Sequence, residues 1–505
     1  TKSVLYMIFY FLMIIAFSYF YATIQFNPVE ISNNLKKNGG FIPGFRPGKP
    51  TADFIKKVLN KVTLFGAIYL GVVAILPLLI GKIVNGAQPI DQFVFKDDDG
   101  QYYMYYGGWG HCNMVKMGSD LISIVPFEDG TTYKEVTPEN YIEGPFMLKH
   151  NGKYYFQYGA PGTEFKVYAD GVYVSDSPLG PFVYQKHNPM CYKPGGYVQG
   201  AGHGGTFCDV KGNYWHVATC MLSLKYKFER RIGLYPVAFD KDGVMYSSTA
   251  FGDYPNWAEP MDVKNPAERF TGWMLLSYGK PVEVSSTDSI HAASNLTDES
   301  MRTYWAARSG NPGEWAGIDL GSTKNVRAVQ LNFYDHKAVQ YNRAMDIYHQ
   351  YRIFASEDGK EWTLVIDKSD SDKDCPHDYI ELNEPLRARY LKYENVHMPT
   401  GNVALSGFRV FGNGDGDVPQ AVKGLTVKRD RKDRRNALIS WQPEASAYGY
   451  NIYYGTAEGK MYNAITVLGQ TEYDFRGLDA DTDYYFTIEA LNENGRSPLC
   501  KTTKN

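Results

Sequence analysis

The chain of 505 residues has little cysteine and almost no net charge. Its six cysteines are scattered without CxxC spacing, so neither a zinc site nor a disulfide scaffold is indicated. The net charge of −3 gives no basic footprint, which argues against a nucleic-acid partner. No motif for an organic cofactor is present, and none is expected. The length suggests about three or four domains.

Charged residues are also missing from two N-terminal runs, residues 3–29 and 62–81. Each run is long enough to cross about 30 Å of hydrocarbon as a helix. A signal peptide has a shorter apolar core and a cleavage site, and a buried core helix has one polar face. We therefore predict two transmembrane α-helices, at residues 4–22 and 62–81, with the membrane as a partner.

The segment between these runs is rich in Lys and Arg, which places it in the cytoplasm by the positive-inside rule. The later domains are then expected to be periplasmic or extracellular, with the native enzyme part secreted. The letters FNPVEISNNLKKNGGFIPGFRPGKPTADFIKKV resemble a cytoplasmic loop of the Sec translocon channel subunit, SecY. By that resemblance Arg46 engages the ribosome and the motor ATPase.

The SecY-like piece is assigned to residues 1–81 as a two-helix transmembrane fragment. Two helices cannot enclose a pore, so translocation is not expected of this chain. The chain starts with Thr1, which agrees with a fragment. A fused or misassembled reading frame, joined near residues 77–81, is the expected origin, and a genuine fusion is the alternative.

Beyond the fragment the composition favours β structure, because Tyr suits pleated strands and Gly suits tight turns. The chain has 41 Tyr and 49 Gly. A hairpin signature of a polar turn ending in Gly and a Tyr-rich strand recurs. A radial β array and a sandwich are equally compatible with composition alone. The repeats are DDDGQYYMYY, KHNGKYYFQY, DVKGNYWHVA and DKDGVMYSS.

The motifs around these turns resemble glycoside hydrolase family 43, a five-bladed β-propeller. They are GAQPIDQFVFKDDDGQYYMYYGGWG, NYIEGPFMLKHNGKYYFQYG, GAGHGGTFCDVKGNYWHV and RRIGLYPVAFDKDG. We assign residues 82–260 to a partial propeller. The resemblance implies inverting hydrolysis of arabinofuranosides, xylosides or related plant-type polysaccharides. Inversion needs an acid and a base with their carboxyls about 6.5–9.5 Å apart.

The resemblance assigns roles to individual residues. Glu143 in YIEGPF matches the general acid, and its alternative is a solvated turn glutamate. Asp91 in PIDQFVF matches the carboxylate that orients the acid and modulates its pKa, since like charge disfavours ionisation. Its alternative is a turn-capping aspartate. His203 in GAGHGGTF matches the axial residue that binds a metal or a water, with a structural histidine as the alternative.

Three more residues are candidates for substrate binding. Trp109 and His111 in GGWGHCN offer a stacking face and a hydrogen bond, although core packing of Trp109 is equally open. Arg231 reaches a sugar hydroxyl or forms a surface ion pair. The family's general base, an Asp upstream of Asp91, is absent, because SecY-like sequence takes its place. Five blades also need about 300 residues, more than residues 82–260 provide.

Residues 281–412 resemble the discoidin, or coagulation-factor type C, jelly roll of family 32 carbohydrate-binding modules. The markers are TYWAA, EWAGIDLG and SEDGKEW. Such modules bind sugars and often hold a structural Ca²⁺ through oxygen ligands. Asp298 is the candidate calcium ligand, against a plain turn aspartate, and Trp305 is expected in the core.

Residues 417–505 resemble a fibronectin type III domain, with Trp441 as the early core residue and Leu478 and Tyr484 in a tyrosine corner. The expected fold is therefore mostly β. Three functions compete: a glycosidase, inactive here if the base is missing; a non-catalytic carbohydrate-binding surface protein; and a translocase channel fragment. The sequence leaves the sugar, the linkage and the metal open.

Overall fold

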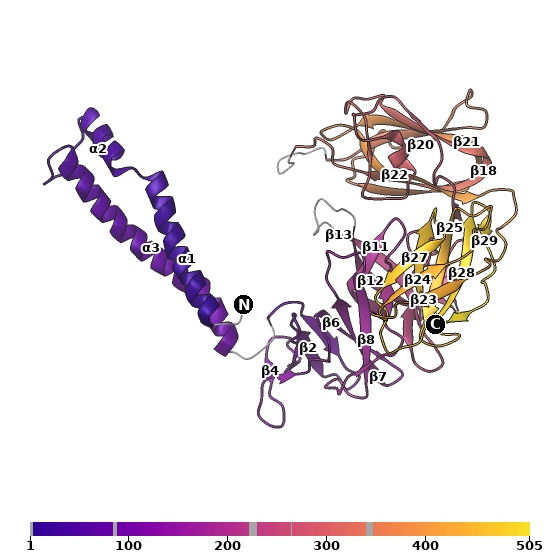
Figure 1. Cartoon of the computed structure of the whole chain (residues 1–505), viewed down its shortest axis with the longest axis horizontal. Coiled ribbons are helices and arrows are strands. Elements are labelled where there is room, and N and C mark those ends of the chain that lie inside the picture. Colours follow the sequence, from indigo (N-terminus) through magenta and orange to yellow (C-terminus); the bar gives the residue numbers. More distant parts are fainter. Residues whose placement is uncertain (1–3, 84–87, 222–229, 264, 340–346) are drawn as a thin grey trace. The chain divides into compact units, whose positions relative to one another are not determined.

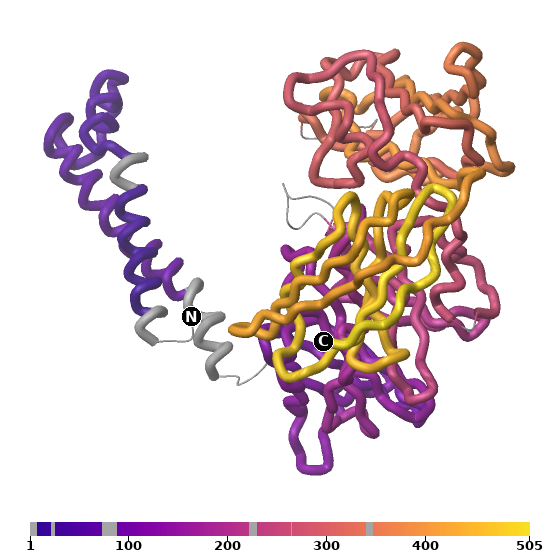
Figure 2. Tube along the Cα trace, turned by 45° about the vertical axis from the view of Figure 1, so that its right-hand side comes forward, coloured from indigo at the N-terminus to yellow at the C-terminus, as the bar shows by residue number. Residues whose placement is uncertain are grey.

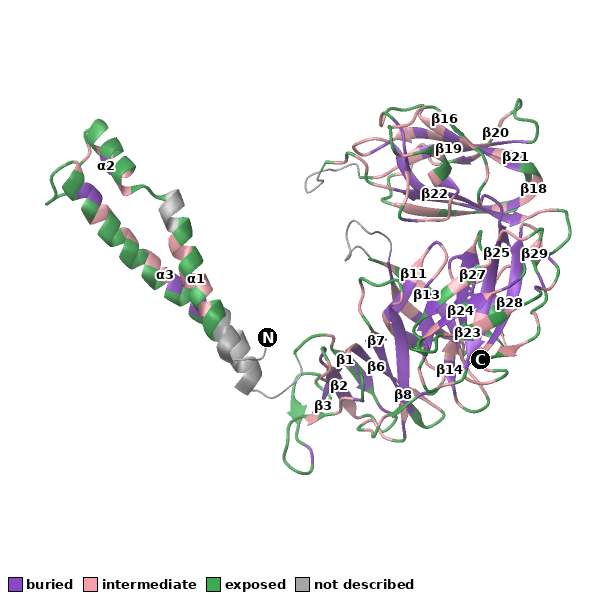
Figure 3. Cartoon of the chain, viewed as in Figure 1, coloured by how far each residue is buried: buried purple, intermediate pink, exposed green. Residues whose placement is uncertain are grey.

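The structure is a computed structural model that describes residues 4–83, 88–221, 230–263, 265–339 and 347–505. These residues form two compact units, Thr1–Gln88 and Pro89–Asn505. The first unit is helical and the second is mostly β (Figure 1). Figure 3 shows that the buried residues gather along the strands of the second unit.

The helical unit consists of α1 (Val4–Gln25), α2 (Pro28–Lys37) and α3 (Lys49–Ile83). Asn27 caps α2, since its side-chain oxygen accepts hydrogen bonds from the amides of Val29 and Glu30. α1 and α3 lie side by side (Figures 1 and 2). The Tyr19 hydroxyl of α1 donates to the Asn60 carbonyl of α3 at 3.2 Å, which ties the two helices together.

The predicted spans at residues 4–22 and 62–81 fall within α1 and α3, but the prediction that they are transmembrane helices is wrong. Over the described residues, neither helix presents an apolar stretch long enough to cross a bilayer. α3 is one 35-residue helix, and its N-terminal half carries three lysines at residues 56–61, ahead of the predicted span.

The second unit begins with a five-stranded and a nine-stranded sheet, which contain three four-stranded antiparallel groups, here called blades 1, 2 and 3. One parallel pair, Ala169 with Ala201, joins blade 2 to blade 3. Two short strands, β5 (Lys134–Glu135) and β10 (Cys191–Tyr192), pair with β3 and β8. The blades are β1 (Phe93–Lys96), β2 (Tyr102–Tyr106), β3 (Asn113–Met117) and β4 (Ile124–Val125); β6 (Glu143–His150), β7 (Lys153–Ala160), β8 (Ala169–Ser175) and β9 (Val183–Tyr184); and β11 (Gln199–Cys208), β12 (Tyr214–Met221), β13 (Arg230–Phe239) and β14 (Met245–Ser247).

The predicted hairpins join β1 to β2, β6 to β7, β11 to β12 and β13 to β14, so this prediction is confirmed. In the first turn the Gly100 amide donates to the Asp97 carbonyl at 3.0 Å, and the Asp97 amide donates to Gln101 at 2.9 Å. Gly100 has φ 87°, a conformation that costs glycine little. The polar turn and its glycine therefore set the strand pairing.

Residues 274–413 form one eight-stranded sheet system around a core that contains Trp305, whose side chain is fully buried. Trp305 is thus a core residue, as predicted. Short 3₁₀ helices lie at Pro266–Arg269 and Ala293–Leu296. The strands are β15 (Met274–Leu275), β16 (Val282–Val284), β17 (Trp305–Ala306), β18 (Trp315–Phe333), β19 (Gln350–Ser356), β20 (Thr363–Asp367), β21 (His377–His397) and β22 (Ala404–Asn413).

The last part is a sandwich of a three-stranded and a five-stranded sheet. Trp441 is buried in its core, and the Tyr484 hydroxyl accepts from the Asp479 amide at 3.2 Å, as a tyrosine corner predicts. The strands are β23 (Thr426–Arg429), β24 (Asn436–Ser440) and β27 (Glu472–Arg476) in one sheet, with β25 (Gly449–Gly455), β26 (Asn463–Leu468), β28 (Tyr485–Asn492), β29 (Gly495–Arg496) and β30 (Thr503–Lys504) in the other.

The blades and the two C-terminal parts are packed together through buried charges. Lys193 lies 3.1 Å from Asp253. Arg409 of β22 pairs with Glu299 at 2.5 Å and donates to the Asp253 carbonyl at 2.7 Å. Removing one member of such a network leaves an uncompensated buried charge, which typically costs 3–5 kcal/mol. The jelly roll is therefore fixed against the blades.

Asp240 of blade 3 contacts Lys460 and Tyr462 of the fibronectin-like part, and this contact should make the stability of the protein depend on pH. Asp240 in the β13–β14 turn accepts from Lys460 at 2.6 Å and from Tyr462 at 2.7 Å. Burial alone would raise its pKa, but these two hydrogen bonds outweigh burial and lower the pKa of Asp240 to about 2. Because the unfolded value is about 3.9, this stabilisation is complete above pH 4 and is lost as the pH falls towards 2.

We expect Asp240→Asn to lower the free energy of unfolding by about 2 kcal/mol at pH 6 and by little at pH 2. Urea titrations of both proteins at several pH values measure this gap. Asp176→Asn, which removes an exposed carboxylate paired with Lys153, is the control and should cost less than 1 kcal/mol. A gap that stays constant from pH 6 to pH 2 would contradict the assignment.

Candidate active site

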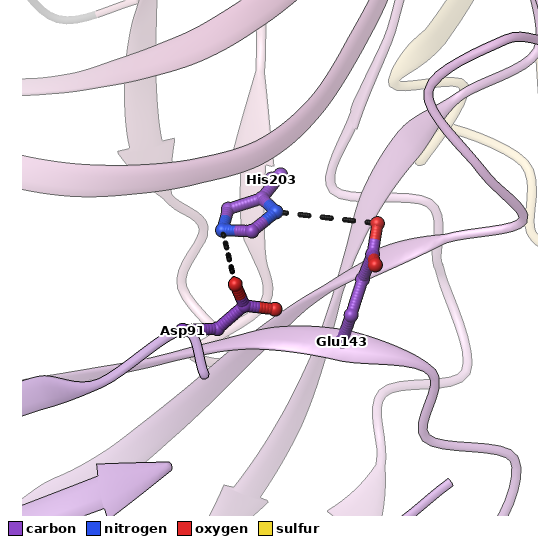
Figure 4. A group of neighbouring side chains, drawn as sticks. All are labelled: Asp91, Glu143 and His203. Atoms are coloured by element: carbon purple, nitrogen blue, oxygen red, sulfur yellow. Dashed lines mark ion pairs between the residues drawn. The ribbon is translucent and has the colours of Figure 1, made fainter. Parts of the chain in front are cut away.

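Three predicted side chains from different blades meet at one place (Figure 4). Asp91 precedes β1, Glu143 begins β6, and His203 lies in β11. His203 Nε2 is 3.9 Å from Asp91 Oδ1, and its Nδ1 is 4.0 Å from Glu143 Oε1. The imidazole therefore lies between the two carboxylates, and the three groups remain partly open to solvent.

The backbone at this site is unusual. Asp91, Trp109 and His203 have φ values of 54°, 56° and 52°, in the left-handed region that non-glycine residues rarely adopt. Such conformations cost on the order of 1 kcal/mol or more and persist only where the surroundings enforce them. Their concentration beside Glu143 is typical of a functional site.

Asp170 of β8 holds the His203 segment in place. Its Oδ1 accepts from the His203 amide and its Oδ2 from the Gly204 amide, each at 2.7 Å. His216 Nε2 also lies 2.7 Å from Asp170 Oδ2. A Cβ at Gly204 would stand 2.2 Å from the Val217 carbonyl, so only glycine fits between the strands. Blade 3 and the acid of blade 2 are thus locked together.

Tyr168 contacts the candidate acid directly, since its hydroxyl donates to Glu143 Oε1 at 2.5 Å. Burial, and then this hydrogen bond, raise the pKa of Tyr168 well above its ordinary value, while the charge of Arg230 lowers it slightly. The phenol therefore remains a neutral donor that fixes the orientation of the Glu143 carboxylate. Arg230 is close enough to act on this pair.

Three residues of this site were not predicted from the sequence: Asp170, Tyr168 and His216. A signal for Asp170 exists, because it is the one acid in the strand ADGVYVS, which is otherwise apolar or small and is buried almost throughout. Buried carboxylates are rare unless they are paired. His216 is the matching case in YWHVATCM, and its side chain is fully buried. The pairing itself requires the fold.

A cavity of ≈ 390 Å³ opens beside this site. Phenylalanine and glycine make up half of its lining residues, and Asp91 and His203 are the charged or titratable groups. The nearest ligand-type oxygens of Asp91 and Glu143 are within 4.8 Å of each other. That is shorter than the about 6.5–9.5 Å between an acid and a water-activating base in inverting enzymes. Asp91 is thus too close to Glu143 to act as that base.

The three residues predicted to bind substrate do not line the cavity beside Asp91. Trp109 is 74% exposed, so it is not a core residue and its ring is available for stacking. His111 Nδ1 is 2.9 Å from Glu135 Oε1 at the surface. Arg231 lines a different cavity, next to His377, and not the one beside Asp91.

The two candidate metal sites differ in the number of ligand atoms that they offer. Asp91, Glu143 and His203 together offer three ligand atoms that a cation can share. Asp298 instead accepts from the Ser300 amide at 2.9 Å, and burial raises its pKa. Within the described residues no group of three or more His, Cys, Asp or Glu ligands includes Asp298. A calcium ion there would need backbone carbonyl ligands, and it stays a prediction.

The jelly roll has a second cluster of polar aromatic groups. Tyr304 is stacked on Tyr334 and on His291, with ring centroids 4.0 Å apart in both pairs. Its hydroxyl lies 3.1 Å from His336 Nδ1, and His336 Nε2 lies 2.7 Å from Asp288. Because a ring covers each face of Tyr304, the cluster offers hydrogen-bonding edges to a ligand and not an open stacking face of Tyr304.

Four families match the chain in succession. Residues 1–108 match the SecY family, and residues 77–245 match glycosyl hydrolases family 43. Residues 281–407 match the F5/8 type C domain, and residues 419–504 match the fibronectin type III domain.

Individual relatives cover small parts of the chain. Beta-D-galactofuranosidase xynD of Aspergillus niger is 43% identical over 104 residues, 21% of this chain and 29% of that protein. Protein translocase subunit SecY of Mycobacterium leprae is 54% identical over 79 residues, 16% of this chain and 18% of that protein. The chain therefore spans less than a third of either relative. A solved α-L-arabinofuranosidase from Clostridium thermocellum is 27% identical, covers 32% of this chain and 55% of that chain, and has a TM-score of 0.26.

The four resemblances inferred from the motifs are confirmed by these matches. Asp91, Glu143 and His203 all lie inside residues 77–245. No single family describes the whole chain; its candidate active site belongs to the segment that matches glycosyl hydrolases family 43.

Proposed function

We propose that the blade segment is a glycosidase that hydrolyses O-glycosidic bonds of arabinofuranosyl, xylosyl or related furanosyl polysaccharides by inversion. The observation that supports this most is the meeting of Asp91, Glu143 and His203 beside an open cavity. The galactofuranosidase relative, identical at 43% of 104 residues, extends the candidate substrates to galactofuranosides.

In this proposal Glu143 protonates the departing oxygen. The hydrogen bond from Tyr168 fixes one of its oxygens, and the other is left to face the substrate. Asp91 donates no proton and activates no water. Its Oδ2 accepts from the Gly144 amide at 3.3 Å, so it holds the turn that carries Glu143 and adds negative charge beside it. Trp109 provides a stacking face.

The jelly roll is proposed to bind the same carbohydrate. Its Tyr304 cluster supports this, and the F5/8 type C match supports a binding rather than a catalytic role. Action outside the cytoplasm, where such polysaccharides occur, is part of the proposal. A structural Ca²⁺ at Asp298 remains a secondary proposal, and no organic cofactor is invoked.

The alternative is a carbohydrate-binding protein without turnover. It is favoured by one observation: the segment where the resemblance expects the general base matches SecY instead. The cavity beside Asp91 also has no second acid among its described lining residues. A chain that binds but barely hydrolyses would satisfy this alternative.

A substrate panel separates the two proposals. We expect slow release of nitrophenol from aryl α-L-arabinofuranosides, β-D-xylosides or β-D-galactofuranosides, with inversion read by NMR of the first-formed anomer. Aryl α-D-glucopyranosides are the control and should not react. Retained anomeric configuration would contradict the inverting assignment, and no release from any furanoside or xyloside would leave only the binding function.

A further inference from the structure

A second cavity, of ≈ 570 Å³, lies where blade 3 meets the jelly roll. Blade 3 contributes Val198, Met221, Arg230 and Arg231, and β18 and β21 contribute Asn332 and His377 among others. The volume falls within the about 300–1,000 Å³ of small-molecule sites. Neither part alone encloses this space, so the jelly roll completes it.

The described residues that line this cavity include cationic side chains and no acidic ones. Two guanidinium groups line it, and no carboxylate is found among its described lining residues. The Arg230 guanidinium donates to the neutral hydroxyl of Thr163 at 3.3 Å, and in the described part of the chain no carboxylate lies within ion-pair distance of it. Burial, and then the charge of Arg231, lower the pKa of His377 to about 4, so this imidazole is neutral at pH 7.

Polar groups in the wall have unused hydrogen-bonding capacity. Asn332 is 1% exposed, and its Nδ2 has no partner in the structure. Its Oδ1 lies 2.9 Å from His377 Nδ1. If the amide is turned over, the oxygen becomes the atom without a partner, so one atom of Asn332 is unsatisfied in either orientation. A buried polar group of this kind costs about 1–3 kcal/mol.

We propose that this cavity binds a carboxylated sugar unit, a uronate, of the polysaccharide that the blade segment cleaves. Arg230 and Arg231 supply the donors that match a carboxylate, because the guanidinium fork pairs with it in bidentate geometry. The exposed Ile232 packs against an apolar sugar face. The inference rests on the proposed function, which it narrows to acidic polysaccharides.

The position of the cavity agrees with this role. β11 begins at Gln199, next to lining residue Val198, and passes through His203 at the candidate active site, which at about 3.3 Å per residue is at most about 13 Å away. Arg230 lines the cavity, and its charge also lowers the pKa of Tyr168, the hydrogen-bond donor to Glu143 at the candidate active site. The uronate is therefore expected a few sugar units from the cleaved bond.

The test measures binding in the full chain carrying Glu143→Gln, so that ligands stay intact. The probes are oligosaccharides from glucuronoxylan and from polygalacturonate, each beside its carboxyl-reduced form, in isothermal titration calorimetry. We expect at least one acidic form to bind about tenfold or more tightly than its reduced counterpart, because hydrogen bonds to charged groups are the stronger ones. Arg230→Gln and Arg231→Gln should each remove most of this preference.

Arg435→Gln is the matched control, since its guanidinium pairs with Asp433 in the fibronectin-like part, and it should keep the preference. Equal binding of acidic and reduced forms, a preference that survives both arginine substitutions, or no binding at all would each overturn the inference. Because no turnover is needed, a chain that prefers the uronate but hydrolyses nothing contradicts only the proposed function. The two failures are thus distinguishable.

Discussion

Glu143→Gln is expected to lower the rate of hydrolysis of glycosides with poor leaving groups by about 10²–10⁴-fold, the usual contribution of a general acid. Glutamine cannot supply the proton that an alkoxide leaving group needs. The same substitution should cost far less with a dinitrophenyl leaving group, which departs without protonation. Steady-state rates on a methyl and a dinitrophenyl furanoside measure the difference.

A second version of the protein and a control substitution make this test interpretable. Both rates are measured in the chain and in a version that carries an added blade upstream of blade 1, so that a slow background does not hide the effect. Glu128→Gln removes an equal charge from an exposed turn and should leave both rates unchanged. Full activity of Glu143→Gln on the methyl furanoside would exclude Glu143 as the acid.

The convergence of Asp91, Glu143 and His203 could be anticipated because each lies in a short motif that resembles glycoside hydrolase family 43. The resemblance, and not a local pattern, assigned the three residues to one site. Tyr168 could not be assigned in the same way. Its hydrogen bond to Glu143 depends on the packing of β8 against β6 through β7, which no local pattern in the sequence encodes.

The contacts between domains could not be predicted from the sequence either. The sequence assigns the blades and the jelly roll to separate segments, 82–260 and 281–412, whereas Asp253 of the first forms a buried network with Arg409 and Glu299 of the second. The three residues are separated by up to 156 positions. Composition shows that charges exist and not which of them become buried together. The cavity at Arg230 and Asn332 follows from this packing and was therefore not foreseeable.

The helical prediction failed for a related reason. A count of uncharged residues identified where α1 and α3 lie, and these positions were correct. It did not identify where α3 begins, and the helix extends back through the lysines at residues 56–61. Length and position of an apolar run can be read from the sequence, whereas the extent of the helix that contains it depends on its packing.

The largest gain in activity is expected from adding the missing blade upstream of blade 1, with its water-activating aspartate. In place of residues 1–82, we propose to join the segment that precedes the matched region in the Aspergillus niger galactofuranosidase. The rate on aryl furanosides should rise by about 10²–10⁴-fold, the usual contribution of a general base. Asp91 cannot supply this function, because its oxygen lies within 4.8 Å of the Glu143 oxygen and leaves no room for the water.

The control for this experiment is the same fusion with the new aspartate replaced by asparagine, which restores the blade without the base. If packing alone limits the chain, this control should gain as much as the full fusion. If the base limits it, only the aspartate version gains, and azide should partly rescue the asparagine version by attacking in place of the activated water. A chain that already matches the completed enzyme would show that its base lies elsewhere, and the cavity beside Asp91 would then have to admit a carboxylate from outside its present walls.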